Sequence, residues 1–223
     1  MHKTEKRPIL TYTETGYVFI SPGDNPDRVV DALLDTGYDE EFCLALDFDP
    51  PFIAELMAAG FLVMSAELGG DEEDEDEIPP ENAGDDKTDR ERRYVLLPKL
   101  HLIRSALFFP ELHIKKSIGP LLKRYELRFD ADFDRILKRC VDIHGEGWLT
   151  RPLQDSLRAI RRGSGLPVRP VSFGVYRDGE LRAGEFGVAA GRVYTSYSGY
   201  YDEDNAGTVQ MVLMSQYLRD QGF

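Results

Sequence analysis

The chain has 223 residues, of which 42% are hydrophobic, and its formal net charge is −13. This length provides a hydrophobic core for one large domain or two small ones. No apolar run approaches the ~18 residues that a membrane-spanning helix needs, and the N-terminus has no apolar signal region. We therefore expect a cytoplasmic protein that does not span a membrane.

The two cysteines and four histidines limit the chemistry that the chain can perform. Cys43 and Cys140 are far apart in the sequence, and the simplest interpretation is two buried thiols in a reducing cytoplasm. A disulfide or a reactive thiol is the alternative. The histidines do not have the spacing of metal ligands, so we expect neither a metal nor a cofactor.

The charge is distributed unevenly along the chain. Residues 92–169 carry 17 basic and 8 acidic side chains, whereas residues 67–91 carry 13 acidic and 2 basic ones. A basic region in an acidic protein can bind phosphates, because counterion release is a local effect. The alternative is a solvated surface of mixed charge, so composition alone leaves nucleic-acid binding open.

Residues 1–66 predict a small α+β subdomain. Asn25-Pro26 is typical of a helix N-terminus, and Gly37 and Gly60 are typical of residues that follow a helix end. The expected elements are one or two short strands within 8–20, a helix over 27–36, a strand over 42–46, a helix over 52–59 and a strand over 61–64.

Residues 67–91 interrupt this pattern, because seven consecutive acidic residues run from Asp71 to Glu77. Such a block repels itself and buries too little apolar surface to offset its chain entropy. We expect a disordered acidic insertion that forms a mobile surface loop. The alternative is a mimic of nucleic-acid phosphates that shields the basic region.

Residues 92–223 predict a second and larger domain of mixed helix and strand. Thr150 can cap the helix that begins at Arg151-Pro152. The expected elements outside the central stretch are strands over 94–97, 104–109 and 125–130 and helices over 114–124, 132–143, 151–162 and 206–220.

The stretch from Val171 to Tyr201 predicts an antiparallel meander of three short strands. Val171, Phe173 and Val175 alternate with smaller or polar residues, which is typical of a half-buried strand. Asp178-Gly179 is a strong hairpin signal, because both central positions of a type I′ turn need a positive φ. The helices before and after the meander should pack as layers on its faces.

Three motifs follow one another in this second domain. They are Phe109-Pro110-Glu111-Leu112-His113-Ile114-Lys115-Lys116-Ser117, Glu146-Gly147-Trp148-Leu149-Thr150-Arg151, and Asp178-Gly179-Glu180-Leu181 followed by Gly184-Glu185-Phe186-Gly187-Val188-Ala189-Ala190-Gly191. Their order and spacing resemble those of the leucyl/phenylalanyl-tRNA–protein transferases. A weaker match joins Asp47-Phe48-Asp49-Pro50 to Gly60-Phe61, so the resemblance covers residues 42–66 and 108–223.

This resemblance implies a small N-terminal domain followed by an acetyltransferase-like (GNAT) domain. It implies that leucine or phenylalanine, or methionine, is moved from aminoacyl-tRNA to the N-terminal amine of a protein that begins with Arg or Lys. That protein is thereby marked for degradation under the N-end rule. The aminoacyl ester is already activated, so such an enzyme needs mainly positioning and a proton acceptor for the attacking amine.

The matching positions provide candidate contacts for these substrates. The implied substrate-binding residues are Trp148, Thr150, Glu185, Phe186, Tyr197, Ser198 and Asn205. Trp148 can serve as a stacking platform for a single-stranded base, although without this resemblance a tryptophan is more typical of a core. The candidates for acceptor-stem phosphates, against the alternative of ordinary solvated charge, are Lys115, Lys116, Lys123, Arg124, Arg135 and Arg139. No catalytic residue is assigned.

The chain departs from the family pattern at four places, one of which is Gly207-Thr208 in place of the family's Ser-Lys. Tyr197 stands where the family has a glutamate that helps to bind the aminoacyl-adenosine, and a phenol cannot act as a carboxylate. Glu185 replaces an apolar residue of the side-chain pocket, so either the amino-acid preference differs or Glu185 points outward. The family continues after the helix over 206–220 into a strand with an Asp-x-Gln motif, whereas this sequence stops at Phe223. The sequence is therefore either a natural short form or part of a longer chain.

Two other functions are consistent with these residues. A relative with altered chemistry could bind tRNA or a protein N-terminus without transfer. An acyl-CoA N-acyltransferase of the same broad fold would need a pyrophosphate-binding loop that opens a helix. Arg161-Arg162-Gly163-Ser164-Gly165 has suitable glycines, but it ends a helix rather than starting one, which is the wrong end of the helix dipole.

Overall fold

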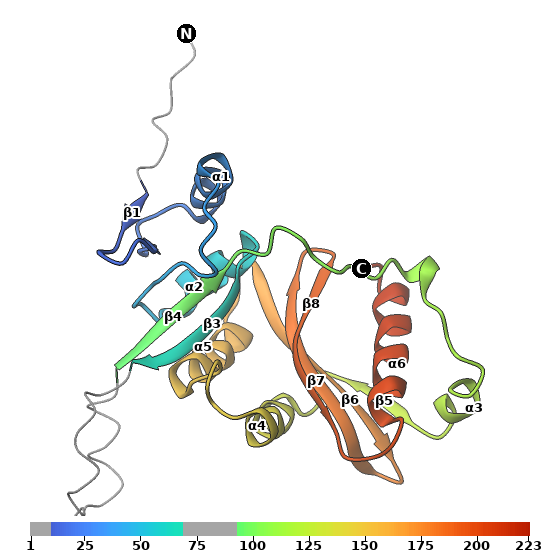
Figure 1. Cartoon of the computed structure of the whole chain (residues 1–223). Coiled ribbons are helices and arrows are strands. Elements are labelled where there is room, and N and C mark those ends of the chain that lie inside the picture. The colour runs from blue at the N-terminus through green and yellow to red at the C-terminus, as the bar shows by residue number, and fades with distance from the viewer. Residues whose placement is uncertain (1–9, 69–92) are drawn as a thin grey trace, which may run out of the picture.

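The computed structural model describes residues 10–68 and 93–223 and is an α+β structure, as the sequence predicts (Figure 1). Its described strands form two antiparallel pairs and one antiparallel sheet of four strands. Helices cover both faces of the larger sheet, which therefore forms the centre of the second half of the chain.

The N-terminal elements follow the expected order. They are β1 (Thr11–Tyr12), β2 (Val18–Phe19), α1 (Pro26–Thr36) and α2 (Pro50–Ala58). The side chain of Asn25 accepts a hydrogen bond of 3.1 Å from the Arg28 backbone N–H at the start of α1. Gly37 ends the helix with φ +66°, which confirms the predicted boundaries because glycine adopts this conformation without strain.

β3 (Leu62–Leu68) pairs with β4 (Arg93–Lys99) in an antiparallel ladder from Leu62 opposite Lys99 to Leu68 opposite Arg93. The ladder joins strands that lie on the two sides of the predicted acidic insertion. Residues 67 and 68 of that insertion belong to β3, and the rest of the predicted disorder lies outside the described residues.

The larger sheet has the order β5-β6-β7-β8. Its strands are β5 (Glu126–Phe129), β6 (Val168–Arg177), β7 (Glu180–Ala190) and β8 (Val193–Tyr201). Asp178 and Gly179 have φ angles of +54° and +80° at the first turn, as a type I′ hairpin requires. The three-stranded meander predicted over 171–201 is confirmed, with β5 added at one edge.

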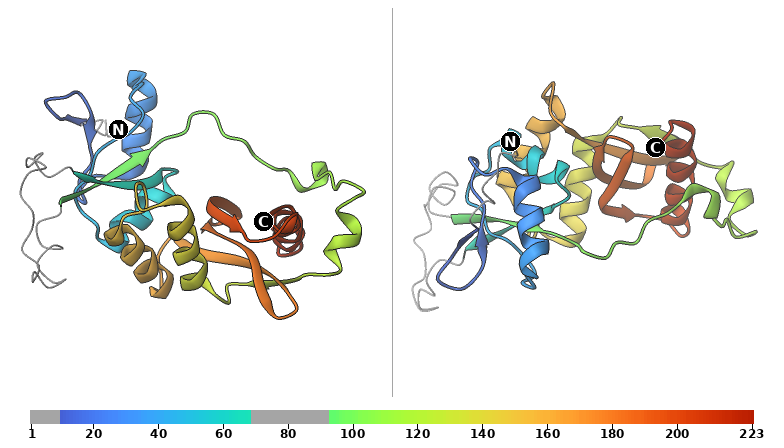
Figure 2. Two further views of the ribbon diagram at one scale, coloured as in Figure 1. Left: turned by 60° about the horizontal axis from the view of Figure 1, so that its bottom comes forward. Right: turned by 90° about the horizontal axis from the view of Figure 1, so that it is seen from above.

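The two faces of this sheet carry different helices, which Figure 2 shows from two sides. α6 (Ala206–Asp220) packs through Met214 and Leu218 against Val171 and Phe173 of β6. α4 (Phe133–His144) and α5 (Arg151–Arg162) cover the opposite face. Side chains of successive strand residues point to opposite faces, so the alternation in the sequence specifies both contacts.

A single hydrophobic cluster connects the two halves of the chain. It contains Phe52 of α2, Val63 of β3, Leu153 of α5 and Phe186 of β7, all nearly inaccessible to solvent. Burial of each such side chain contributes about 1.5–3 kcal/mol. The N-terminal elements are therefore packed directly against the side of the sheet that α5 covers.

Three sequence predictions are wrong. The strand expected over 104–109 is absent, because this segment has no ladder partner and runs as an extended connection to the short 3₁₀ helix η2 (Phe109–Glu111). The helix expected over 114–124 shrinks to α3 (Gly119–Leu122), since Pro120 favours a helix start and disfavours helix in the residues before it. Residues 42–46 form only isolated bridges, at Leu44 and Ala45.

Candidate substrate-binding site

An aromatic cluster lies where β3 meets the α4–α5 connection and the larger sheet. We define it as Trp148, Phe186 and Tyr197. The ring of Trp148 is 6.5 Å from that of Phe186 at an interplanar angle of 9°, and 6.5 Å from that of Tyr197 at 44°. Phe186 is fully buried, whereas Trp148 and Tyr197 remain half-buried. The structure thus brings together three of the seven predicted substrate contacts.

Ser65 of β3 fixes the segment that carries Trp148. The Ser65 N–H donates to the Trp148 carbonyl at 2.9 Å, and the Ser65 Oγ accepts from the Thr150 N–H at 3.1 Å. The hydroxyl groups of Ser65 and Thr150 are 2.8 Å apart. Thr150 occupies the N-cap position of α5, but its side chain makes no capping bond, which corrects the prediction. Its hydroxyl instead contacts Ser65. Ser65 is distant in the sequence, so local sequence patterns could not predict this contact.

Tyr197 occupies a register shift in β8, where the pairing changes from Phe186–Ser198 to Gly187–Ser196. Its hydroxyl accepts a long hydrogen bond of 3.4 Å from the Val63 N–H of β3. Burial raises the pKa of Tyr197, while the nearby Arg104 guanidinium acts in the opposite direction. The side chain therefore stays neutral at physiological pH and links β8 to the N-terminal half.

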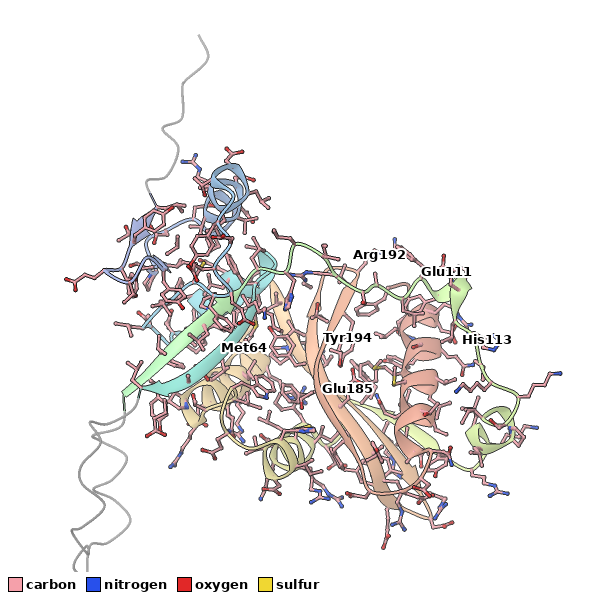
Figure 3. All side chains as sticks on the ribbon, in the orientation of Figure 1. Met64, Glu111, His113, Glu185, Arg192 and Tyr194 are labelled. Atoms are coloured by element: carbon pink, nitrogen blue, oxygen red, sulfur yellow. The ribbon has the colours of Figure 1, made fainter. Side chains whose placement is uncertain are left out.

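Glu185 precedes Phe186 on β7 and so points to the opposite face, toward α6 (Figure 3). Its side chain is only 6% exposed, which answers one question left by the sequence: Glu185 does not point outward into solvent. The Tyr194 hydroxyl donates to the Glu185 Oε1 at 3.0 Å. Burial raises the pKa of the Glu185 carboxyl, and hydrogen bonds from Ser196, Tyr194 and Gln210 oppose that shift.

Of the remaining two predicted contacts, Ser198 is the strand partner of Phe186 and lies on the same face of the sheet, whereas Asn205 lies apart from the aromatic cluster. The Ser198 hydroxyl hydrogen-bonds with the Cys140 thiol of α4, whose pKa burial raises to about 11. Asn205 is exposed beyond the far end of β8 and adopts a left-handed conformation with φ +67° at the start of α6. Cys43 and Cys140 are both free and buried, as the sequence predicts.

The six predicted basic contacts fall into two groups rather than one surface. Lys115, Lys116, Lys123 and Arg124 are exposed on and around α3, whose neighbour Ile118 packs against α6. Arg135 and Arg139 belong to α4, on the other face of the sheet. Arg139 lies 2.5 Å from Asp202 and over the ring of Tyr200, so much of its charge is already paired.

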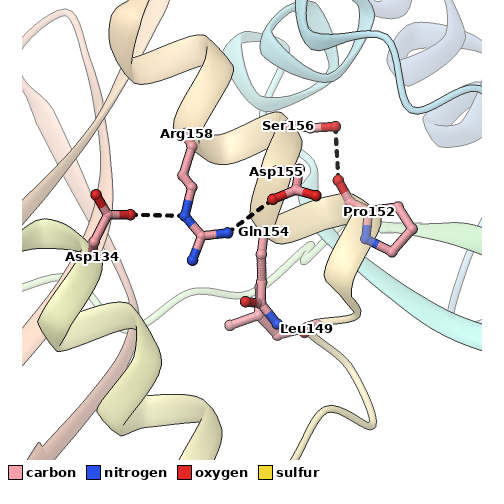
Figure 4. Close-up of polar contacts among 7 residues, drawn as sticks. All are labelled: Asp134, Leu149, Pro152, Gln154, Asp155, Ser156 and Arg158. Carbon is pink, nitrogen blue, oxygen red and sulfur yellow. Dashed lines mark hydrogen bonds and ion pairs between the residues drawn. The ribbon is translucent and has the colours of Figure 1, made fainter. Parts of the chain in front are cut away.

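An open cavity of about 620 Å³ lies between α4 and α5, beside the connection that carries Trp148. Most charged groups around it are paired: Arg158 bonds Asp134 at 2.7 Å and Asp155 at 3.0 Å, as Figure 4 shows. Gln154, which also lines the cavity, donates to the Leu149 carbonyl at 3.0 Å. These contacts stiffen the α4–α5 unit and help to hold the connection in place.

Three residues that the sequence analysis did not single out belong to the site. Ser65 supports Trp148, and Gln210 of α6 reaches Glu185. Arg104 lies near Tyr197 and also contacts the Gly60 carbonyl. A serine among the apolar residues of a predicted strand could have indicated the role of Ser65. The sequence around Gln210 and Arg104 contains no comparable pattern.

Within residues 10–68 and 93–223, no helix is both long and apolar enough to cross a bilayer. In the same described ranges, no three His, Cys, Asp or Glu side chains are grouped in a way that could hold a metal ion.

The fold and the site define an α+β protein in which a four-stranded antiparallel sheet packs against an N-terminal unit across an aromatic cluster. Residues 106–223 match the sequence family described as leucyl/phenylalanyl-tRNA protein transferase, and the chain belongs to that family.

Proteins named leucyl/phenylalanyl-tRNA–protein transferase are also similar to this chain at the level of individual sequences. One from Pseudomonas fluorescens is 34% identical over 126 residues, which cover 54% of this chain and 54% of the relative. One from Pseudomonas syringae pv. tomato is 35% identical over 126 residues, covering 54% and 53%. The chain spans about half the length of the curated relatives it matches.

Proposed function

We propose that this chain transfers leucine, phenylalanine or methionine from aminoacyl-tRNA to the N-terminal amine of proteins that begin with Arg or Lys. The observation that carries the proposal is its membership of the transferase family over residues 106–223. The product proteins would be marked for degradation in the cytoplasm. We propose the sheet with its flanking helices, residues 92–223, as an acetyltransferase-like (GNAT) domain, with residues 1–66 as a separate smaller unit.

The reaction in this proposal is the aminolysis of an ester. The acceptor amine attacks the carbonyl carbon of the aminoacyl group, the bond to the ribose oxygen breaks, and that oxygen takes up a proton as the amine loses one. The ester supplies the driving force, so the protein contributes mainly orientation of the two substrates. The neutral hydroxyl groups of Tyr197, Ser65 and Thr150 lie at the aromatic cluster, whereas the buried carboxyl of Glu185 lies on the other face of the sheet.

The half-buried ring of Trp148 is the proposed platform for the terminal adenine of the tRNA. The ring of Trp148 stacks on that of Phe186, and the Ser65–Thr150 contact holds the adjacent backbone. A ring that is held in place before binding loses little entropy when a base stacks on it. Arg104, which is exposed and near Tyr197, is the proposed contact for a phosphate of the single-stranded end. Further along the tRNA we propose the α3 group, Lys115, Lys116, Lys123 and Arg124, for the acceptor stem.

Two observations bear on the alternative functions. Gly163 donates its N–H to the carbonyls of Ala159 and Ile160 at the end of α5, so this amide is not free to bind a pyrophosphate. This argues against an acyl-CoA enzyme built on that loop. Tyr197 in place of the family's glutamate favours the other alternative, a relative that binds tRNA or protein N-termini without transfer.

A transfer assay separates these functions. Leucyl-, phenylalanyl- and methionyl-tRNA with labelled amino acids are each incubated with the chain and a peptide that starts with Arg or Lys. Label on the peptide that depends on the chain and on an intact tRNA ester is the expected result. Retention of tRNA on a filter without any transfer would favour the binding-only relative, and stimulation by acetyl-CoA without tRNA would favour an acyl-CoA enzyme.

A further inference from the structure

Glu185 is an unusual group for the interior of a sheet–helix layer. It lies on β7, and its strand partners on either side are Phe173 on β6 and Gly199 on β8. Phe173 is fully buried and packs edge-to-face against Tyr194 at 5.3 Å. A carboxyl group in these surroundings loses its hydration, which is costly unless another group compensates.

The polar side chains around Glu185 are all neutral hydrogen-bond donors. We define the Glu185 cluster as Glu185, Tyr194, Ser196 and Gln210, because the last three hydrogen-bond to the carboxyl. In the described part of the chain, no Lys or Arg forms an ion pair with Glu185. The cluster can therefore orient the Glu185 carboxylate, but it contains no positive charge that balances the charge of this carboxylate.

The cluster also lies near the edge of the sheet. β8 has no second strand partner among the described residues, and the β8 residue opposite Glu185 is Gly199, which contributes no side chain. On the helix, the residue after Gln210 is Met211, which is 60% exposed. The gap between β8 and α6 is therefore the direction from which we expect a ligand group to approach the carboxyl.

From these observations we infer that Glu185 binds the side-chain ammonium or guanidinium of a basic amino acid. Such a cation would form a charge-assisted hydrogen bond with a carboxylate already held by Tyr194 and Gln210. The inference rests on the proposed function, which offers two sources of this group. It is either the aminoacyl group of a lysyl- or arginyl-tRNA, or the basic N-terminal residue of the acceptor protein.

Pairs of ligands that differ only in charge test this inference. For the aminoacyl arm, the ligands are adenosines that carry lysine or norleucine, and arginine or citrulline, through a stable amide at the 3′ position. For the acceptor arm, they are tripeptides that begin with the same four residues. Calorimetry gives the dissociation constants for the unaltered chain, for Glu185→Gln, and for the control Glu126→Gln, an exposed glutamate on β5 of the same sheet.

In one of the two arms, we expect the charged ligand to bind about 10- to 100-fold more tightly than its neutral isostere. The ratio should fall to about 1 in Glu185→Gln and remain unchanged in Glu126→Gln, and the arm in which this occurs identifies the source. Equal binding of charged and neutral ligands, absence of binding in both arms, or a ratio that survives Glu185→Gln would overturn the inference. Thermal melting of Glu185→Gln verifies that this variant is folded.

The transfer assay distinguishes failure of this inference from failure of the proposed function. Transfer of leucine or phenylalanine with no charge-dependent binding in either arm would retain the function and reject the role of Glu185. Charge-dependent binding that requires Glu185, without transfer from any aminoacyl-tRNA including the lysyl and arginyl forms, would retain the cation site and reject the transferase activity.

Discussion

The hydroxyl groups of Ser65 and Thr150 lie 2.8 Å apart although 85 positions separate the two residues in the sequence. Ser65 is fully buried and Thr150 is 4% exposed. The contact joins β3 of the N-terminal half to the residue before α5, and Ser65 also binds the carbonyl of Trp148. The position of the aromatic cluster thus depends on a polar contact between the two halves of the chain.

Replacement of Ser65 by alanine should destabilise the fold by about 1–3 kcal/mol, because the Thr150 N–H and hydroxyl would then be buried without a partner. Chemical denaturation measures this difference. Ser105→Ala, at an exposed serine, should change the free energy of unfolding by less than about 0.5 kcal/mol. Equal effects of the two substitutions would show that the Ser65 contact contributes no stability.

Trp148 is the single tryptophan of the chain, so its fluorescence reports on the aromatic cluster alone. A 3′-aminoacylamino-adenosine that stacks on the ring should quench this emission in a saturable way. Trp148→Ala should weaken use of aminoacyl-tRNA by about 1–3 kcal/mol, the contribution of one stacked base. Trp148→Phe keeps an aromatic ring and should recover part of the loss. Unchanged kinetics in a folded Trp148→Ala protein would exclude the platform role.

The sequence predicts well those parts of the fold that depend on short-range signals. Asp178-Gly179 specifies the first turn of the meander, Asn25 and Gly37 specify the ends of α1, and the strand alternation places Val171 and Phe173 on one face, where both pack against α6. Each of these effects involves residues that are close in the sequence. Local preferences therefore suffice to identify the elements and the class of fold.

The parts that were missed depend on distant partners. The segment over 104–109 has the composition of a strand, but a strand needs a partner for its backbone groups, and no described strand pairs with it. In the same way, Thr150 has the character of an N-cap, but Ser65 competes for its hydroxyl. The candidate contacts Glu185 and Phe186 are adjacent in the sequence, yet the pleat of β7 separates them onto opposite faces.

Glu185→Gln should alter the pH dependence of stability. Burial raises the pKa of this carboxyl above its ordinary value of 4.5, so the folded state favours the protonated form. The stability associated with that form is complete below about pH 4.5 and is lost as the pH rises through the raised pKa. Tyr194 also faces the carboxyl and Cys140 lies across the sheet on α4, but burial raises the pKa of both groups, so they remain neutral over this range.

Without ligand, Glu185→Gln should therefore be more stable than the unaltered chain at pH 8, by about 1–2 kcal/mol, and the difference should shrink toward pH 4. Thermal or urea unfolding at several pH values measures it. Glu126→Gln is the matched control, since that carboxylate is exposed and is paired with Arg128. A difference that stays constant with pH would show that Glu185 keeps the same protonation state folded and unfolded.

Gly187 is constrained by a close approach within the sheet. A Cβ atom at this position would lie 2.6 Å from the Tyr194 hydroxyl and would also overlap the Thr195 carbonyl, which is backbone and cannot rotate away. Gly187→Ala should destabilise the fold by about 3 kcal/mol and displace Tyr194 from Glu185. Gly119→Ala, where a Cβ meets no atom within 4 Å, is the control and should be nearly neutral. A neutral Gly187→Ala would mean that β8 shifts easily at this point.

The arrangement of basic residues leads to a prediction about salt. Reversing the charges of Lys115 and Lys116 should weaken tRNA binding and reduce the slope of log K against log salt by about 1–2, because each phosphate contact in a duplex contributes about 0.9.

The double reversal Arg135→Glu with Lys138→Glu on α4 changes the net charge equally on the other face of the sheet. It should leave the slope nearly unaltered if the acceptor stem lies along α3. A larger change of slope from the α4 pair would indicate that the tRNA binds on the opposite face of the sheet. Equal changes from the two pairs would indicate general electrostatic repulsion rather than local contact.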